Sequence, residues 1–340
     1  MVKKLLYVFS IVCAFSLFTA CSDDDNESNT PGTWEKLSKT YEKEQVKIAM
    51  GEVAVPAEGK TVEIKATSAE KATVTLNNIV VENKKVVVET SLKETDGTYS
   101  FTGESTVGNC TVSVNGTVKD GVASVVYSRK LTDPIVGSWN MKFIPNGSDK
   151  AADIHTLINT GNVENDAQMA GLLQVVGTLL AKEVDSVNVK LNENGVLGIS
   201  WKKTGTDKMQ SLDEIAKMIN LQYYVADNKF MIAIDKSYVS ALTALGKDAL
   251  NKFGIKMDDI LALLVDNGGY YALPLNVKTQ DNDAIFYMNK EQILPVLDIV
   301  TPLLDKISSP GFEAVKPLVP IVLMAIKNAK EVEFGLVFTK

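Results

Sequence analysis

The stretch ETDGTYSFTGESTVGNCTVSVNGTVKDGVASVVYSRK, residues 94–130, decides the first half of the fold. It consists of short runs rich in β-branched and aromatic residues, separated by turn-forming pairs. Asp96-Gly97, Asn115-Gly116 and Asp120-Gly121 are three such pairs, and each predicts a two-residue hairpin turn. The stretch therefore predicts an antiparallel meander.

The same pattern extends toward the N-terminus. KTVEIKATS, KATVTLNNIVV and KKVVVETSL alternate apolar and polar residues with a period of two, as strands with one buried face do. We therefore predict a small antiparallel β domain over residues 34–132, either closed into a barrel or packed as a sandwich.

A second unit begins after the break at Asp133-Pro134. A strand pattern starts at Gly137 and Trp139 in GSWNMKF, and the last strand pattern is EVEFGLVFTK. Helical patterns lie between the strands, including one at 152–158 that runs on into AQMAGLLQVVGTLLAKE. Residues 133–340 are therefore predicted to form an α+β domain with helical insertions in a β framework.

The first 20 residues have the pattern of a secretory signal peptide. Lysines precede an uncharged apolar run that ends in Thr19, Ala20 and Cys21. The run is shorter than the roughly 20 residues that span a bilayer, so a retained transmembrane helix is the weaker alternative. Small residues directly before Cys21 resemble a bacterial lipobox, which implies cleavage after residue 20 and acylation of the Cys21 thiol.

Residues 21–33 are polar and acidic, and we expect them to form a disordered tether. Ser22, Asp23, Asp24 and Asp25 resemble the export signal of surface lipoproteins in Bacteroidetes. That resemblance implies an outer-membrane lipoprotein exposed on the cell surface. Acyl chains would then hold the protein at a membrane that it does not span.

Charge and composition exclude several classes of protein. Without residues 1–20, which hold two lysines and no acidic residue, the formal net charge falls from −7 to −9, so no nucleic-acid partner is expected. Arg129 is the only arginine, which disfavours a dedicated phosphate or sialic-acid site. Cys110 is the only cysteine left after processing, so we predict no intrachain disulfide and a small buried side chain.

No catalytic or metal-binding motif is present in the sequence. His155, the single histidine, falls at a predicted helix start and is expected to be a surface or capping residue. Asp281 and Asp283 offer oxygen ligands for Ca²⁺ but lack the ligand set of an EF-hand loop, so a plain turn is favoured. We therefore expect no catalytic residue, metal or cofactor, while a hydrolase with two facing carboxylates depends on distances that a sequence does not contain.

Two aromatic doublets and one tryptophan are the candidate ligand-binding residues. They are Tyr223, Tyr224, Tyr270, Tyr271 and Trp201. Exposed rings would offer a stacking surface to sugars, and packing in the core is the alternative. The apolar helical stretches GLLQVVGTLLA and PLVPIVLMAI pack deeply, line an apolar cavity or meet a partner.

Gly137 and Trp139 resemble the Gly-x-Trp motif that opens lipocalin-type barrels, although a buried tryptophan of another fold gives the same pattern. Lipocalins pack an arginine over this tryptophan, and no arginine follows residue 134. Together with the lipobox, the arrangement resembles Bacteroidetes surface lipoproteins of unknown function with calycin-like barrels. We therefore expect a non-catalytic protein that binds a glycan or a small apolar ligand. The alternative is a structural or interaction subunit with a protein partner in an outer-membrane complex.

Overall fold

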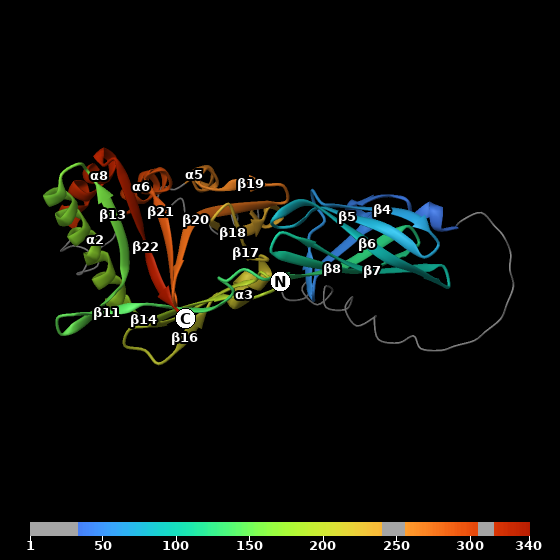
Figure 1. Cartoon of the computed structure of the whole chain (residues 1–340), viewed down its shortest axis with the longest axis horizontal. Coiled ribbons are helices and arrows are strands. Elements are labelled where there is room, and N and C mark those ends of the chain that lie inside the picture. Colours follow the sequence, from blue (N-terminus) through green and yellow to red (C-terminus); the bar gives the residue numbers. More distant parts are fainter. Residues whose placement is uncertain (1–32, 240–255, 305–315) are drawn as a thin grey trace.

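The chain folds into two β-rich units that follow one another along the sequence. The computed structural model describes residues 33–239, 256–304 and 316–340. The first unit contains the sheet that ends at Leu131, and the second contains the sheet that begins at Gly137. The units lie end to end along the long axis of the molecule (Figure 1).

The first unit is a nine-stranded sheet in the order β1-β4-β5-β6-β7-β8-β9-β2-β3. Its neighbouring strands are antiparallel except for β2 and β9, which pair in parallel. Two short 3-10 helices, η3 (Thr33–Leu37) and η4 (Lys43–Gln45), flank its first strand. The strands are β1 (Lys39–Glu42), β2 (Val46–Met50), β3 (Val53–Val55), β4 (Thr61–Ser68), β5 (Lys71–Val80), β6 (Asn83–Thr95), β7 (Thr98–Val107), β8 (Cys110–Lys119) and β9 (Val122–Leu131).

Two of the three predicted hairpin turns in this unit are confirmed. Asp96-Gly97 and Asp120-Gly121 have positive φ at both positions and join antiparallel strands, as two-residue hairpins require. The turn predicted at Asn115-Gly116 is wrong, because β8 runs straight through this pair. A Cβ on Gly116 would lie 2.2 Å from the ring of Phe101, so this glycine makes room for an aromatic side chain.

The second unit has an eleven-stranded sheet whose main path is β16-β15-β14-β10-β22-β21-β20-β18-β17. β13 and β19 join it beside β22 and β20, and β11 and β12 form a separate hairpin. Its strands are β10 (Gly137–Met141), β11 (Phe143–Asn146), β12 (Asp149–Ala152), β13 (Ile154–Asn159), β14 (Val184–Leu191), β15 (Leu197–Lys203), β16 (Met209–Ser211), β17 (Gln222–Ala226), β18 (Lys229–Asp235), β19 (Val265–Asn267), β20 (Tyr270–Gln280), β21 (Asp283–Asn289) and β22 (Glu331–Thr339).

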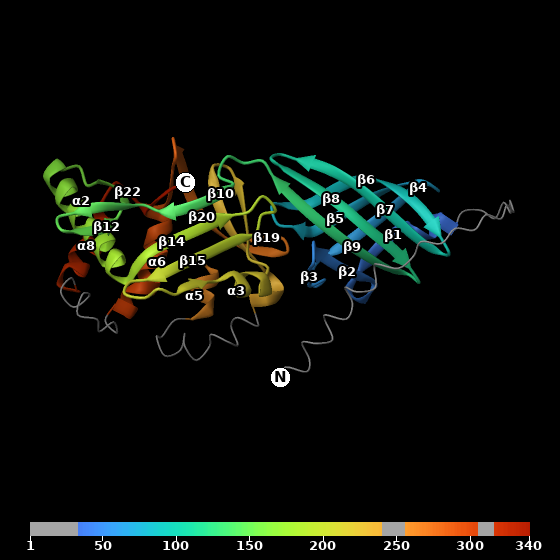
Figure 2. The ribbon, with the colours of Figure 1, turned by 90° about the horizontal axis from the view of Figure 1, so that it is seen from below.

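In the described parts of the chain α-helices accompany only the second sheet, and α2 and α8 lie at its end remote from the first unit (Figures 1 and 2). Asn162 caps the longest one, α2, by accepting hydrogen bonds from the backbone N–H groups of Glu164 and Asn165. The helices are α2 (Val163–Glu183), α3 (Asp213–Met218), α5 (Met257–Leu261), α6 (Lys290–Leu304) and α8 (Val319–Asn328), and η5 (Lys316–Leu318) is a 3-10 turn.

The helix predicted at 152–158 is wrong. These residues include most of β13, and each residue from Ile154 to Asn159 pairs with β22. His155 is therefore a strand residue and not a helix cap. Pairing with a distant strand outweighs the local helical pattern here.

The second sheet curves until its two ends approach each other. The pair Val196 and Gln222 forms a single antiparallel bridge between the segments that carry β15 and β17. Beyond this bridge β15 pairs with β16 instead. The prediction of β-rich units with helical insertions is thus confirmed, but neither sheet closes into a barrel within the described residues.

Candidate functional site

The curvature of the second sheet defines an inner face. Its rings contact one another in a row: Tyr223 stacks on Phe230, Phe230 meets Phe286 edge to face, and Phe286 meets Phe338 likewise. The four rings come from β17, β18, β21 and β22, so the row ties distant strands together. We call the side of the sheet that carries this row the inner face.

Trp139 closes one end of the inner face. Its side chain is 2% exposed, and its indole N–H donates a hydrogen bond of 2.6 Å to the carbonyl of Ile135. The ammonium of Lys340 lies 4.9 Å from the centre of the indole ring. The C-terminal lysine therefore makes a cation–π contact with the tryptophan of the Gly137-x-Trp139 motif.

Much of the inner face is apolar but only half-buried. By strand alternation and register, its residues fall on seven strands around the aromatic row. A filled interior would leave such side chains fully buried. The half-buried apolar residues of this face are Val187, Val189, Ile199, Trp201, Val225, Ile232, Ile234, Tyr271, Leu273, Leu275, Val277, Phe286, Met288, Phe334 and Leu336.

The opposite side of β17, β18 and β20 is more deeply buried, because the first unit packs against it. Met231, Ala233 and Tyr270 belong to a cluster that also contains Val81 of the first unit. The Tyr270 hydroxyl donates a hydrogen bond of 2.8 Å to the carbonyl of Ile79, and burial raises its pKa well above the usual value. The inner side of these strands is thus the accessible side.

Arg129 joins the two units. Its guanidinium is buried and lies 2.8 Å from the Glu82 carboxylate. It also donates hydrogen bonds to the Gln222 side chain (2.6 Å) and to the carbonyl of Tyr223, both in β17. A Cβ on Gly195 would lie 2.2 Å from this guanidinium. Glycine at this position therefore leaves room for the Arg129 side chain.

A second buried ion pair lies at the same contact. Lys60 of the first unit and Asp235 at the end of β18 are 2.8 Å apart, and both side chains are 0% exposed. Gly269 lies against the backbone of Asn78, where a Cβ would come within 2.4 Å of the carbonyl oxygen. The two units are therefore fixed together by specific buried polar contacts.

The structure separates the five predicted aromatic residues. Tyr223, Tyr224 and Tyr270 are buried, with hydroxyl partners in Asn192, Asn267 and Ile79, so these three rings follow the alternative of packing in the core. Trp201 and Tyr271 remain half-buried on the inner face. Cys21, Ser22, Asp23, Asp24 and Asp25 lie outside the described residues.

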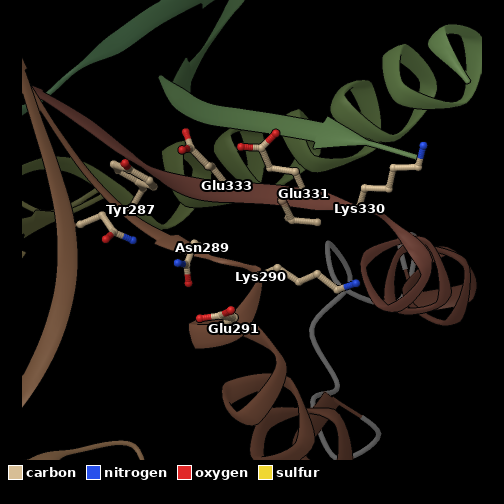
Figure 3. A pocket seen from close by; sticks show the side chains of 9 residues that line it. Tyr287, Asn289, Lys290, Glu291, Lys330, Glu331 and Glu333 are labelled. Carbon is tan, nitrogen blue, oxygen red and sulfur yellow. The ribbon is translucent and has the colours of Figure 1, made fainter. Parts of the chain in front are cut away.

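A polar pocket of about 320 Å³ opens on the other side of β20, β21 and β22, where these strands meet the start of α6 (Figure 3). Glu331 and Glu333 are two residues apart on β22 and line the pocket together, with Asn289 and Glu291 across from them. All but one of its lining side chains are polar; they are Asn276, Tyr287, Asn289, Lys290, Glu291, Lys330, Glu331, Val332 and Glu333.

His155 contacts Glu333 from outside the lining of this pocket. Its Nε2 lies 2.7 Å from the Glu333 carboxylate, which also accepts hydrogen bonds from Lys278 at 2.8 and 3.0 Å. Burial opposes ionisation of Glu333, but the bonds from Lys278 and His155 outweigh it and lower its pKa. The ammonium of Lys278 also lies 4.4 Å from the centre of the Tyr287 ring, and the centre of the His155 ring lies 5.3 Å from it.

Gly335 makes this cluster sterically feasible. It pairs with His155 on one side and with Tyr287 on the other. A Cβ at Gly335 would lie 2.3 Å from the Phe286 carbonyl oxygen and 2.5 Å from the Tyr287 Cβ. In the sequence, the signal for this pocket is the alternation of Glu331 and Glu333 with apolar residues. That alternation alone predicts a strand and does not indicate a binding site.

The remaining candidate residues have structural environments. Cys110 is buried as predicted, and burial raises its pKa to about 12, which keeps the thiol protonated. Asp281 has positive φ in the β20–β21 turn, and Asp283 pairs with Lys142 at 2.6 Å. Within the described ranges, no group of three or more His, Cys, Asp or Glu side chains is arranged to hold a metal ion.

Comparison with known proteins gives no relative: no family model, curated protein or solved structure matches the chain. Among the described residues, no helix is long and apolar enough to cross a membrane.

Proposed function

We propose that the protein is a lipid-anchored outer-membrane lipoprotein that binds a small apolar ligand on the inner face of its second unit. The observation that carries this proposal is the half-burial of the apolar inner face, whereas the opposite side of β17, β18 and the start of β20 is buried under the first unit. Along β18, Met231 and Ala233 are buried under the first unit, whereas Ile232 and Ile234 stay accessible. Burying apolar surface contributes about 25 cal/mol per Å², so an apolar molecule is the ligand that this face favours.

A lipocalin-like framework for the second unit is consistent with its strand order. The main path is a meander in which the first strand, β10, pairs with the last, β22. The bridge between Val196 and Gln222 brings the ends of the path together on one side. Lys340 packs over Trp139 where lipocalins place an arginine, which supports the resemblance based on Gly137 and Trp139.

The proposed cellular location rests on the sequence. Acylation of Cys21 would hold the chain at the outer membrane, and Ser22 to Asp25 would direct it to the cell surface. η3, the blue segment with which the described chain begins, lies at the end of the first unit remote from the second (Figure 1). The first unit would then act as a spacer that holds the ligand-binding unit away from the membrane.

A second candidate function is docking of a protein partner in an outer-membrane complex. Ile321 and Met324 of α8 are 49% and 63% exposed, and they lie three residues apart on one side of the helix. Crosslinking in intact cells from a photoreactive residue at 324 tests this candidate. A discrete crosslinked partner supports it, and the absence of any crosslink counts against it.

Binding of an apolar ligand is tested with the chain from Ser22 onward. Native mass spectrometry asks whether lipid copurifies, and titration with a fluorescent fatty-acid probe gives the affinity. Leu273→Asn places an amide on the inner face, and Ile285→Asn makes the same kind of change on the other side of the sheet. We expect only Leu273→Asn to weaken probe binding, by about tenfold or more for a lost contact of about 1.4 kcal/mol. Equal effects of the two variants, or no saturable binding by the wild type, would overturn the proposal.

A further inference from the structure

The polar pocket of Figure 3 is separate from the apolar inner face, although both use β21 and β22. Strand alternation sends Tyr287 and Glu333 to the pocket and their neighbours Phe286 and Phe334 to the inner face. The pocket volume of about 320 Å³ falls at the lower end of the range for small-molecule sites.

Hydrogen bonds hold the pocket wall in place without a ligand. Asn289 accepts a bond from the backbone N–H of Gln292, and the Gln292 side chain accepts one from the backbone N–H of Asn289. This reciprocal pair is a capping box at the start of α6. Gln292 also accepts a bond of 2.6 Å from the Asn276 amide and donates one to the carbonyl of Pro274. Residues that line the pocket on β20 and β21 are thus positioned by one buried amide network.

Two cationic groups at the pocket are already engaged. Lys278 is paired with Glu333, and Lys290 donates a hydrogen bond of 2.5 Å to the carbonyl of Ala329. Among the described residues, the ammonium of Lys330 and the carboxylates of Glu291 and Glu331 have no hydrogen-bond or ion-pair partner. The pocket wall therefore offers two free carboxylates and one free ammonium to a ligand.

Tyr287 supplies an aromatic wall. Its half-buried ring is held by the edge of His155 and by the ammonium of Lys278. A ligand that combines several hydroxyl donors with an apolar ring face matches such a site, because carboxylates accept hydrogen bonds from hydroxyls and aromatic rings pack on C–H faces.

We infer that this pocket binds an uncharged sugar ring, with Glu331 and Glu291 as hydroxyl acceptors and Tyr287 as the packing wall. The inference adds a second ligand site to the proposed apolar one and does not depend on it. The lining holds three carboxylates and two ammonium groups, and this excess of negative charge disfavours uronic acids, sialic acids and sugar phosphates.

The test is a titration of the chain from Ser22 onward with neutral monosaccharides and disaccharides, and with glucuronic acid as the anionic comparison. Calorimetry gives the affinity, and saturation-transfer NMR shows which sugar protons touch the protein. Glu331→Ala removes an exposed acceptor and Tyr287→Ala removes the wall; Glu164→Ala, on α2 and outside the pocket, is the matched control.

We expect a neutral sugar to bind, Glu331→Ala and Tyr287→Ala each to weaken it about tenfold or more, and Glu164→Ala to leave it unchanged. Because Tyr287→Ala also removes the contacts of the ring with Lys278 and His155, Glu331→Ala is the decisive variant, and its thermal transition must match the wild type. Absence of binding by every neutral sugar, preference for glucuronic acid, or full binding by Glu331→Ala would overturn the inference. Leu273→Asn should retain sugar binding, which separates failure of this site from failure of the apolar one.

Discussion

Lys60 and Asp235 form an ion pair of 2.8 Å that is completely buried between the two units. The ammonium also lies 5.5 Å from the centre of the Tyr270 ring, which is buried at the same contact. Because both charges are buried, removing either partner would leave the other in the interior without a compensating charge. The relative placement of the units is thus specified by chemistry and not only by apolar contact.

Lys60→Ala should lower the free energy of unfolding by about 3–5 kcal/mol, because it leaves the Asp235 carboxylate buried and unpaired. Urea unfolding followed by circular dichroism measures the change. The control is Asp207→Asn, which removes the fully exposed partner of Lys202 and should cost less than about 1 kcal/mol. A loss at Lys60→Ala no larger than at the control would contradict the role of the buried pair.

Arg129→Lys should destabilise the protein by about 2–3 kcal/mol, because an ammonium cannot reproduce the bonds of the guanidinium to Glu82 and Gln222. Lys130→Ala, at the exposed neighbouring position, should stay within about 0.5 kcal/mol of the wild type. Thermal unfolding of the two variants gives the comparison. Equal stability of Arg129→Lys and the wild type would argue against the role of Arg129 in joining the two units.

Gly335→Ala should destabilise the second unit by at least about 1–3 kcal/mol, because the new methyl group collides with the Phe286 carbonyl and with Tyr287. Gly171→Ala is the matched change in α2, where the Cβ meets no atom within 4 Å. It should stabilise by about 0.4–1 kcal/mol. Chemical denaturation distinguishes the two, and the close packing of the cluster would be refuted if both substitutions had the same sign.

The Glu333 cluster should make stability depend on pH in the acid range. The pKa of Glu333 is lowered from its ordinary value of 4.5 in the folded protein, so its contribution to stability is present above that value and is lost as pH falls through the folded pKa. Glu333→Gln should therefore be less stable than wild type at pH 7, and the difference should shrink toward pH 3. Melting temperatures across this range test it, with Glu331→Gln as the control; a constant difference would contradict the prediction.

Local sequence patterns predicted the first unit better than the second. Period-two alternation and Asp-Gly turns need only neighbouring residues, whereas Gly116 shows that a glycine after Asn can serve a distant ring instead of a turn. His155 was misplaced for the same reason, because its strand exists through pairing with β22, almost two hundred residues away. For Tyr224 and Tyr270 the choice between ligand contact and core packing stayed open, because the sequence does not reveal that the first unit covers one side of β17, β18 and β20.

The candidate sites were harder to predict than the fold. Trp201 was predicted to lie on a strand and does so in β15, but the apolar residues of its face come from seven strands spread over 150 positions, roughly half the chain. The polar pocket joins the start of α6 to three strands, and only the folded sheet shows that Glu331 and Glu291 share it. Sequence alternation gives the side of a strand but not what covers that side.

The central claim is that an apolar ligand binds on the inner face, and Trp201 provides the most direct measurement. It lies half-buried on this face opposite Val187, whereas Trp34 lies in the first unit and Trp139 is 2% exposed. A brominated fatty acid quenches tryptophan fluorescence only at short range, so its titration should give saturable quenching in the wild type and in Trp34→Phe. Trp201→Phe should lose that quenching. Undiminished quenching in Trp201→Phe, or none in the wild type, would contradict the account.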